Sequence, residues 1–357
     1  MPVLTVEHET TYSYRRAVGF GEHRMMFRPR DSVDQKLLDW QLEIGPAPAE
    51  LRSILDTQGN NITLARFRGR AKELRFLNRL VVDHTPVVPE PEMLAPYARS
   101  WPFTYELDDR HDLARTMDRH YPDPGHAVDA WARSFLLRAQ ATSIAGTVPV
   151  LDLLRSVTAE IRRDFTYTPR FEEGMQEPAR TLALRNGTCR DFAILMMEAV
   201  RSLGFAARFV TGYIYSPGAD PARPAPPGGA PTHSDTARAV APAGVATRLG
   251  GGSTHAWIEV FLPGLGWTDF DPTNDIVGSR DLIRVASVRD WHQAVPLAGT
   301  WTGFPADSVG MSVSVSVSSS DAAPILPQAP RVAELVSLAA GGGTRAMPDR
   351  SAIGGSS

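Results

Sequence analysis

The sequence predicts an α+β protein with a β-domain at its N-terminus. Residues 1–85 combine β-branched and aromatic residues with period-two alternation, which favours strands. Apolar residues at helical spacing then follow to about residue 203, and alternating patterns return beyond residue 206. A helical block between two strand-rich blocks is typical of this fold class.

The N-terminal region contains several segments with strand character. A strand begins within residues 3–14, and residues 38–44 alternate strictly, which favours a strand with one buried face. The turn cluster at 56–61 separates that strand from residues 62–67, which we expect to be its partner. No acid–base or metal-ligand pattern occurs here, so residues 1–85 are predicted to be a structural β-domain.

A second region begins after three closely spaced prolines near residue 90. The apolar spacing predicts helices at 108–120, 125–137 and 148–164. Four potential metal ligands lie in or beside the first two helices: Asp109, His111, His120 and His126. Their spacing matches no ligand motif, so solvent-exposed helix faces are the preferred interpretation and no metal site is predicted.

The stretch 186–193 holds Cys189, the only cysteine in 357 residues. Thr188 is a plausible N-cap, the following residues are apolar almost all round, and Gly204 marks the end of the helix. Cys189 is therefore expected at the first turn of a buried helix, where the helix dipole lowers the pKa of a thiol. The alternative is that Cys189 is only a small buried apolar residue.

The remaining chain returns to strand patterns. Residues 207–215 read as a strand, and residues 216–253 are so rich in Pro, Gly and Ala that we expect a flexible insertion. A late strand is expected within 311–317, whereas 280–290 is ambiguous. We therefore divide the chain after residue 85 into a core at 86–318 and a disordered tail at 319–357.

Two strands joined by a turn carry the remaining candidate residues. Residues 254–261 alternate and place His255 on the same face as Trp257, and residues 267–273 return after the turn. A hairpin would bring Asp271 within reach of the strand that carries His255. Asp269 lies on the same face as Asp271, so periodicity does not separate the two carboxylates.

Cys189, His255 and Asp271 are the three residue types of a nucleophile, a base and an orienting acid. Each has a structural alternative, because His255 could be a strand histidine with satisfied hydrogen bonds and Asp271 could initiate a turn before Pro272. Asp191 is interpreted as a helix-start charge that the dipole stabilises.

Composition limits the partners of the protein. A net charge of −3 and a pI of about 6.3 imply no bulk attraction to nucleic acid or to an anionic membrane. One cysteine excludes an intrachain disulfide framework and a cysteine-based zinc cluster. Since no apolar run approaches a membrane span and the N-terminus is unlike a secretory signal, we expect a cytoplasmic protein without a membrane partner.

Four blocks of the sequence resemble the transglutaminase-like superfamily in order and spacing. They are Gly-Thr-Cys-Arg-Asp-Phe-Ala at 187–193, the block at 204–213, His-Ala-Trp-Ile-Glu-Val at 255–260, and Gly-Trp-Thr-Asp-Phe-Asp-Pro-Thr at 266–273. The N-terminal segments 8–14, 28–30 and 56–60 resemble the β-domain that precedes this core in bacterial members.

The resemblance implies a papain-like transglutaminase core, in which the helix that carries the nucleophile packs on an antiparallel sheet. It assigns the roles of nucleophile, base and acid to Cys189, His255 and Asp271, and so favours Asp271 over Asp269. It implies acyl transfer from a protein or peptide amide through a thioester, without a cofactor. Bacterial relatives are regarded as cysteine proteases, so the acceptor is water or an amine. Calcium is not carried over, because no calcium-loop pattern is present.

A second hypothesis is a catalytically silent interaction module with the same fold. The β-domain and residues 216–253 would then form its working surface.

Overall fold

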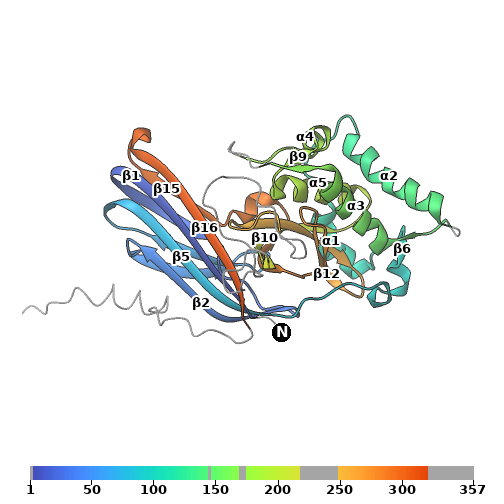
Figure 1. The fold of residues 1–357 in the computed structure, drawn as a ribbon, viewed down its shortest axis with the longest axis horizontal. Helices are drawn as coiled ribbons and strands as arrows, with labels where there is room; N and C mark the ends of the chain where they lie inside the picture. The colour runs from blue at the N-terminus through green and yellow to red at the C-terminus, as the bar shows by residue number, and fades with distance from the viewer. Residues whose placement is uncertain (1–2, 144–145, 169–173, 218–247, 321–357) are drawn as a thin grey trace, which may run out of the picture.

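A computed structural model describes residues 3–143, 146–168, 174–217 and 248–320, and the structural statements below concern these residues. An antiparallel N-terminal sheet lies beside a core of helices and a second sheet (Figure 1). The predicted α+β class is confirmed, and its parts follow the predicted order along the chain.

The N-terminal sheet has seven strands, five of which come from the first 84 residues in the order β2-β5-β1-β4-β3. They are β1 (Val3–Met25), β2 (Gln35–Gly45), β3 (Glu50–Leu55), β4 (Asn61–Arg66) and β5 (Arg70–His84).

One predicted pairing in this sheet is wrong. The strand predicted at 62–67 pairs with β3 and β1, and the strand predicted at 38–44 pairs with β5. The reason is local, because Asp56 accepts hydrogen bonds from the backbone N–H of Gln58 and Asn60 at 2.9 and 2.8 Å. This tight turn joins the two strands that flank it directly.

The other two strands come from the far end of the described chain. They are β15 (Leu297–Thr302) and β16 (Ser308–Ser320), and both pair with β1. Figure 1 shows β16 beside the strands at the start of the chain. The assignment of residues 297–318 to the core therefore needs correction: β5 pairs along one edge of β1, and β16 takes up the hydrogen-bonding groups of the other edge.

The core sheet is antiparallel, with the strand order β13-β12-β11-β10-β14. Its strands are β10 (Ala207–Ile214), β11 (His255–Leu262), β12 (Gly266–Asp271), β13 (Ile276–Val277) and β14 (Leu282–Val288). The predicted hairpin is present, since β11 and β12 pair directly with Leu262 opposite Gly266. The ambiguous segment 280–290 is mainly the edge strand β14.

In the part of the chain that the structure describes, five α-helices cover the core. They are α1 (Leu107–Met117), α2 (Ala127–Thr142), α3 (Val150–Asp164), α4 (Pro178–Leu184) and α5 (Cys189–Ser202). Short elements lie in the connections between the longer strands and helices: the paired strands β6 (Ser100–Trp101) and β7 (Val148–Pro149), the parallel pair β8 (Thr166–Tyr167) and β9 (Asn186–Gly187), and the 3-10 helices η1 (Pro91–Met93), η2 (Pro96–Ala98), η4 (Trp291–Ala294) and η5 (Pro305–Asp307). Helix α5 is buried along most of its length and packs on β10 and β11, as expected from its apolar sequence.

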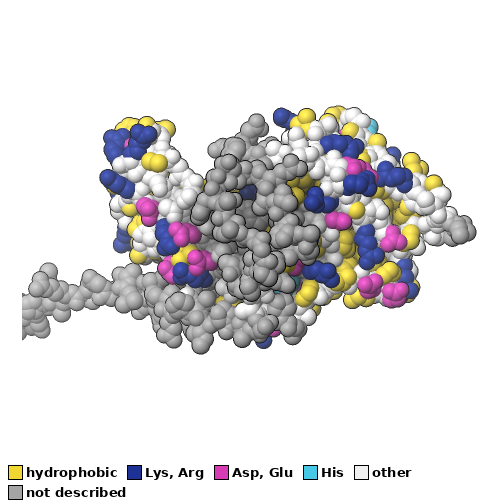
Figure 2. All heavy atoms as spheres, in the orientation of Figure 1, with side chains coloured by type: hydrophobic (Ala, Val, Ile, Leu, Met, Phe, Trp, Pro, Cys, Tyr) yellow, Lys and Arg dark blue, Asp and Glu magenta, His cyan; other side chains and the backbone are white. Residues whose placement is uncertain are grey.

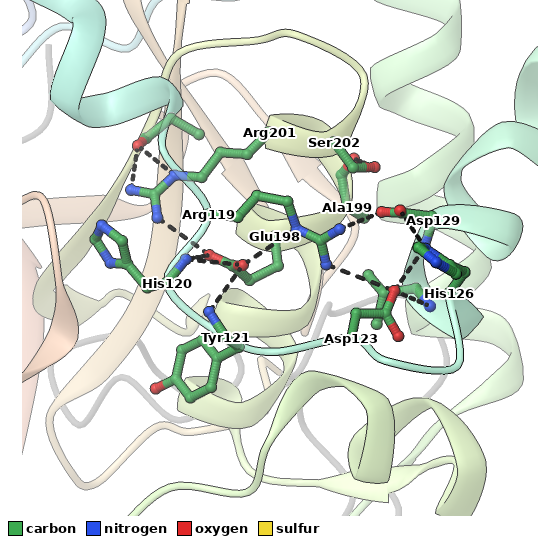
Figure 3. Close-up of polar contacts among 12 residues, drawn as sticks. Arg119, His120, Tyr121, Asp123, His126, Asp129, Glu198, Ala199, Arg201 and Ser202 are labelled. Carbon is green, nitrogen blue, oxygen red and sulfur yellow. Dashed lines mark hydrogen bonds and ion pairs between the residues drawn. The ribbon is translucent and has the colours of Figure 1, made fainter.

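A buried carboxylate fixes the loop before α2 to the middle of α5. Glu198 is fully buried and accepts hydrogen bonds from the backbone N–H of His120 and Tyr121 at 3.2 and 3.3 Å. The guanidinium groups of Arg119 and Arg201 approach the same carboxylate at 3.5 and 3.2 Å (Figure 3). The negative charge is thus compensated from several sides, as a buried charge requires.

The four potential metal ligands noted in the sequence do not form a metal site. Within the described ranges, no group of three or more His, Cys, Asp or Glu side chains could hold a metal ion. His111 is exposed, whereas His120 contacts Asp290 at 2.8 Å and His126 contacts Asp129 at 3.3 Å.

The N-terminal sheet and the core share a packed interface. Apolar residues of β1 and β5, such as Leu4, pack against Tyr213 and Ile283 of the core sheet. Buried polar groups also cross the interface, because His8 Nδ1 lies 2.9 Å from the Tyr213 hydroxyl. The guanidinium of Arg284 binds Asp34 at 2.8 Å. The core is therefore held in a defined position beside the N-terminal sheet.

The visible surface carries no large region of one charge. In Figure 2, basic and acidic side chains are interspersed over both parts of the molecule. Among the described helices, none is long and apolar enough to cross a membrane.

Candidate active site

Cys189 is the first residue of α5, and its side chain is buried. Thr188 is the N-cap, as predicted, and Asp191 completes a capping box. The Asp191 carboxylate accepts hydrogen bonds from the Thr188 N–H at 2.9 Å and from the Gln176 N–H at 2.8 Å. Asp191 therefore does more than complement the helix dipole, because it ties the preceding polar segment to the turn that holds the thiol.

His255 begins β11 and Asp271 ends β12, so the hairpin brings the two side chains together. His255 Nε2 lies 2.8 Å from Asp271 Oδ2, and both side chains are fully buried. Asp271 also accepts hydrogen bonds from the Thr273 N–H and the Asn274 side-chain amide, each at 2.9 Å. These hydrogen bonds hold the Asp271 carboxylate in place beside the His255 ring.

The structure separates the two carboxylates that sequence periodicity could not. Asp269 accepts a hydrogen bond from the indole N–H of Trp257 at 2.6 Å and lies 3.6 Å from Arg284. Burial raises the pKa of Asp269 to about 7. Asp271, and not Asp269, is therefore the hydrogen-bond partner of His255.

The second ring nitrogen of His255 is available to the thiol. Nδ1 is buried and makes no well-aligned hydrogen bond to another described residue. The ring is nevertheless close enough to Cys189 for a hydrogen-bonding and charge interaction between the two side chains. Such loose alignment is common in a resting active site and tightens when substrate binds.

The charges at this site favour a thiolate–imidazolium pair. Burial raises the pKa of the Cys189 thiol, but the hydrogen bond and charge of His255 outweigh burial and hold this pKa below its ordinary value. Burial lowers the pKa of His255, but the Asp271 carboxylate and the Cys189 thiolate raise it to about 10. Both shifts act in the same direction, because each favours a proton on His255 and a negative charge on Cys189.

A third side chain near the thiol was missed by sequence reasoning. Tyr167 lies near enough to Cys189 to feel its charge, and burial together with that charge raises the pKa of Tyr167, so the hydroxyl keeps its proton. Tyr167 is placed there by pairing of β8 with β9, in which it lies opposite Gly187. The only signal in the sequence is a tyrosine just after a helix, which does not identify a partner.

The loop before His255 leaves room for the ring. The Leu249 N–H donates to the Asn274 side-chain oxygen at 2.7 Å, so the residue that holds Asp271 also holds this loop. Gly250 follows with a φ of +86°, and a Cβ built on it would lie 2.7 Å from His255 Nδ1. Glycine is needed here for both its conformation and its close approach to the ring.

We expect Gly250→Ala to slow alkylation of Cys189 by about 100-fold at neutral pH, because the added methyl group displaces the imidazole from the thiol. The measurement is the rate of iodoacetamide labelling by mass spectrometry. Gly252→Ala is the matched control, since Gly252 has a similar φ of +84° and no atom within 4 Å of its Cβ position. Equal rates for the two variants would contradict the steric explanation.

A cavity of about 180 Å³ opens beside the N-terminus of α5. Its lining includes Arg190 and Thr254, the chain neighbours of Cys189 and His255. Thr211 and Ala256 lie opposite each other on β10 and β11 and also line it. The cavity therefore lies beside the chain neighbours of Cys189 and His255, on the sheet face that α5 covers, although neither of these two side chains lines it.

These features define a class of α+β proteins in which one helix presents a buried cysteine beside a sheet that carries a histidine and an acidic residue. Residues 4–83 match the bacterial transglutaminase-like N-terminal region, and residues 138–272 match the transglutaminase-like superfamily. The chain therefore carries a transglutaminase-like N-terminal domain and a transglutaminase-like core domain.

Proteins that are similar over most of this chain exist in mycobacteria. The chain is 28% identical over 320 residues to uncharacterized proteins of Mycobacterium bovis and Mycobacterium tuberculosis, covering 87% of this chain and 91% of theirs. An uncharacterized protein of Mycobacterium leprae is 25% identical over 313 residues, with 88% of this chain and 98% of that protein covered.

A solved structure shares the fold over both parts of the chain. It is described as a "putative cysteine protease" from Cytophaga hutchinsonii, and it is 17% identical with a TM-score of 0.60. The match covers 92% of this chain and 94% of that protein. The arrangement of an N-terminal sheet beside a transglutaminase-like core is therefore common to both proteins.

Proposed function

We propose that this protein is a cysteine enzyme that cleaves amide bonds of protein or peptide substrates through a thioester on Cys189. The observation that supports this proposal best is the buried hydrogen bond of 2.8 Å between His255 and Asp271 beside a thiol whose pKa is lowered. A structural cysteine in apolar surroundings would instead have a raised pKa. The general description of the Cytophaga hutchinsonii protein agrees with this chemistry.

The proposed reaction has two steps. The Cys189 thiolate attacks the carbonyl carbon, the C–N bond breaks, and the imidazolium of His255 gives its proton to the departing amine. Water or a second amine then attacks the thioester carbonyl and loses a proton to His255. The C–S bond breaks, the Cys189 thiolate is restored, and the acyl group leaves as a carboxylic acid or a new amide. Asp271 orients the ring and stabilises its positive charge in both steps.

We propose two groups as hydrogen-bond donors to the developing oxyanion. The backbone N–H of Cys189 points from the first turn of α5, where it lacks a partner within the helix. The Tyr167 hydroxyl, which stays protonated next to the thiol, is the second proposed donor. A hydroxyl held by strand pairing needs little reorganisation as the charge forms.

The test is detection of an acyl-enzyme on Cys189. The full chain is incubated with a mixture of casein peptides and a biotinylated primary amine, quenched in acid and analysed by mass spectrometry. We expect an acyl adduct on Cys189 that hydroxylamine removes, together with hydrolysed or aminated peptides that report the acceptor. The Cys189→Ser variant should form neither the thioester adduct nor the hydrolysed or aminated peptides that derive from it.

Two further measurements distinguish an active enzyme from a catalytically silent interaction module. Tyr167→Phe should reduce turnover by on the order of 10²–10³-fold if its hydroxyl stabilises the oxyanion, while iodoacetamide labelling stays within a few-fold of wild type. A wild-type protein without any acyl adduct, whose Cys189 is alkylated no faster than a model thiol, would show that the fold serves as an interaction module instead.

A further inference from the structure

The cavity beside α5 has one wall that does not belong to the core. On β1 and β16, alternate residues face the core, because successive side chains of a strand point to opposite faces. Thr10 pairs with Val313 and Tyr12 pairs with Met311, and all four line the cavity. The N-terminal sheet therefore contributes directly to the cavity at the N-terminal end of α5, where Arg190 follows the proposed nucleophile in the chain.

This wall carries no charge. Next along the same face, His8 is buried, and burial lowers its pKa to about 4, so the ring is neutral at physiological pH. Its two nitrogens bind the Tyr213 hydroxyl at 2.9 Å and the Thr10 hydroxyl at 3.1 Å. These polar groups form hydrogen bonds with one another, so they present an uncharged surface to a ligand in the cavity.

The segment between β14 and β15 supplies an apolar wall. Trp291, Val295 and Pro296 line the cavity, as does Leu297, the first residue of β15. The only lining residue with a permanent charge, among those described, is Arg190, whose side chain is exposed. Because an exposed charge is screened by solvent, the interior favours an apolar group over an ion.

The size of the cavity fits one side chain. An apolar cavity of about 150 Å³ in another protein holds a benzene ring. At about 180 Å³, this cavity can accept one branched aliphatic or aromatic side chain, but not a longer peptide segment.

We propose that the cavity binds a bulky apolar side chain of the amide substrate, next to the reacting carbonyl, and that the N-terminal sheet sets this preference. The inference rests on the proposed function, because it takes Cys189 as the group that the substrate must reach. The substrate class is therefore a protein or peptide amide with a leucine-like or phenylalanine-like group beside the bond that reacts. The N-terminal sheet then acts as a specificity element and not only as a structural support.

The experiment uses the full chain and chloroacetamides that carry the same reactive group. The N-benzyl, N-methyl, N-(2-aminoethyl) and N-carboxymethyl compounds differ only in the group that would enter the cavity. Rates of Cys189 alkylation are measured by mass spectrometry and divided by the rate of each compound with glutathione. We expect the N-benzyl compound to react at least 10-fold faster than the other three, with saturation at high concentration.

Variants on one strand locate the effect. Val313→Asp places a charge in the cavity wall and should reduce the N-benzyl preference to below 2-fold. Val309→Asp is the matched control, since Val309 is an exposed residue of the same strand outside the cavity lining, and it should keep the preference. If both variants lose the N-benzyl preference, the wall formed by β1 and β16 has no specific role in binding.

The outcomes distinguish this inference from the proposed function. Equal normalised rates for the four compounds, or the fastest reaction with a charged compound, would overturn the inference even if the enzyme cleaves amides. If Cys189 is alkylated slowly but still reacts fastest with the N-benzyl compound, the result would support an apolar binding site and count against catalysis. The rate ratio reports the cavity, and the absolute rate reports the thiol.

Discussion

Replacing Asp271 with asparagine is expected to raise the pKa of the Cys189 thiol and to slow turnover by on the order of 10³–10⁴-fold. The Asp271 carboxylate is a main cause of the raised pKa of His255, and the charged imidazole in turn lowers the pKa of the thiol. Without the carboxylate, His255 loses its proton at lower pH, and the thiolate loses its counterion.

The pH profile of alkylation measures this effect without a substrate. In the wild-type protein, the thiolate should persist at pH values below the ordinary thiol pKa, and the ion pair should last until His255 deprotonates near pH 10. In Asp271→Asn, the acid limb of the iodoacetamide profile should move up by at least one pH unit. Identical pH profiles for the wild-type protein and the variant would contradict the claim that Asp271 stabilises an ion pair between Cys189 and His255.

Asp269→Asn is a suitable control for this experiment. Asp269 lies on the same strand two residues away, is also buried, and binds Trp257 instead of His255. Its carboxyl has a pKa raised to about 7, so an amide is a mild replacement. The acid limb of the Cys189 profile should therefore stay within a few tenths of a pH unit of wild type.

Removing the Glu198 carboxylate is expected to cost about 3–5 kcal/mol of unfolding free energy. Glu198→Ala leaves the fully buried Arg201 side chain without its carboxylate partner, and the backbone N–H groups of His120 and Tyr121 without an acceptor. The measurement is a urea titration followed by tryptophan fluorescence and far-ultraviolet circular dichroism.

Two other variants test the cause of this loss. Glu198→Gln retains an oxygen acceptor and the side-chain volume but not the charge, so it should be destabilised less than Glu198→Ala. Asp118→Ala breaks an exposed ion pair with Arg115 and should change the unfolding free energy by less than about 1 kcal/mol. If Glu198→Ala were no more costly than Asp118→Ala, the buried network would not stabilise the core.

Much of the fold follows from local sequence patterns. Helix α5 and its N-cap at Thr188 follow from a capping residue before an apolar run, and the β11–β12 hairpin follows from a turn between alternating segments. The predicted helix at 148–164 differs from α3 by two residues at its start. Such elements depend on neighbours in the chain, which the sequence displays directly.

Other features depend on partners far away in the sequence. Alternation predicts a strand at 311–317, but it does not say that this strand pairs with β1. Strand alternation puts Asp269 and Asp271 on the same face, so only the family resemblance favoured Asp271 as the partner of His255. The structure shows the hydrogen bond between His255 and Asp271. The catalytic roles of Cys189, His255 and Asp271 stay predictions until the acyl-enzyme is sought. The expected tail lies outside the described residues from position 321 onward, as does most of the expected insertion.

The return of the chain to its first strand affects how the molecule can be divided. The polypeptide crosses from the N-terminal sheet to the core after β5 and crosses back before β15, so two separate connections join the halves. A single proteolytic nick after residue 84 should leave both fragments associated under native conditions, because β15 and β16 remain paired with β1. A truncated gene that begins at the core would produce two strands without their neighbour, and recombinant studies of the core alone would start from a damaged protein.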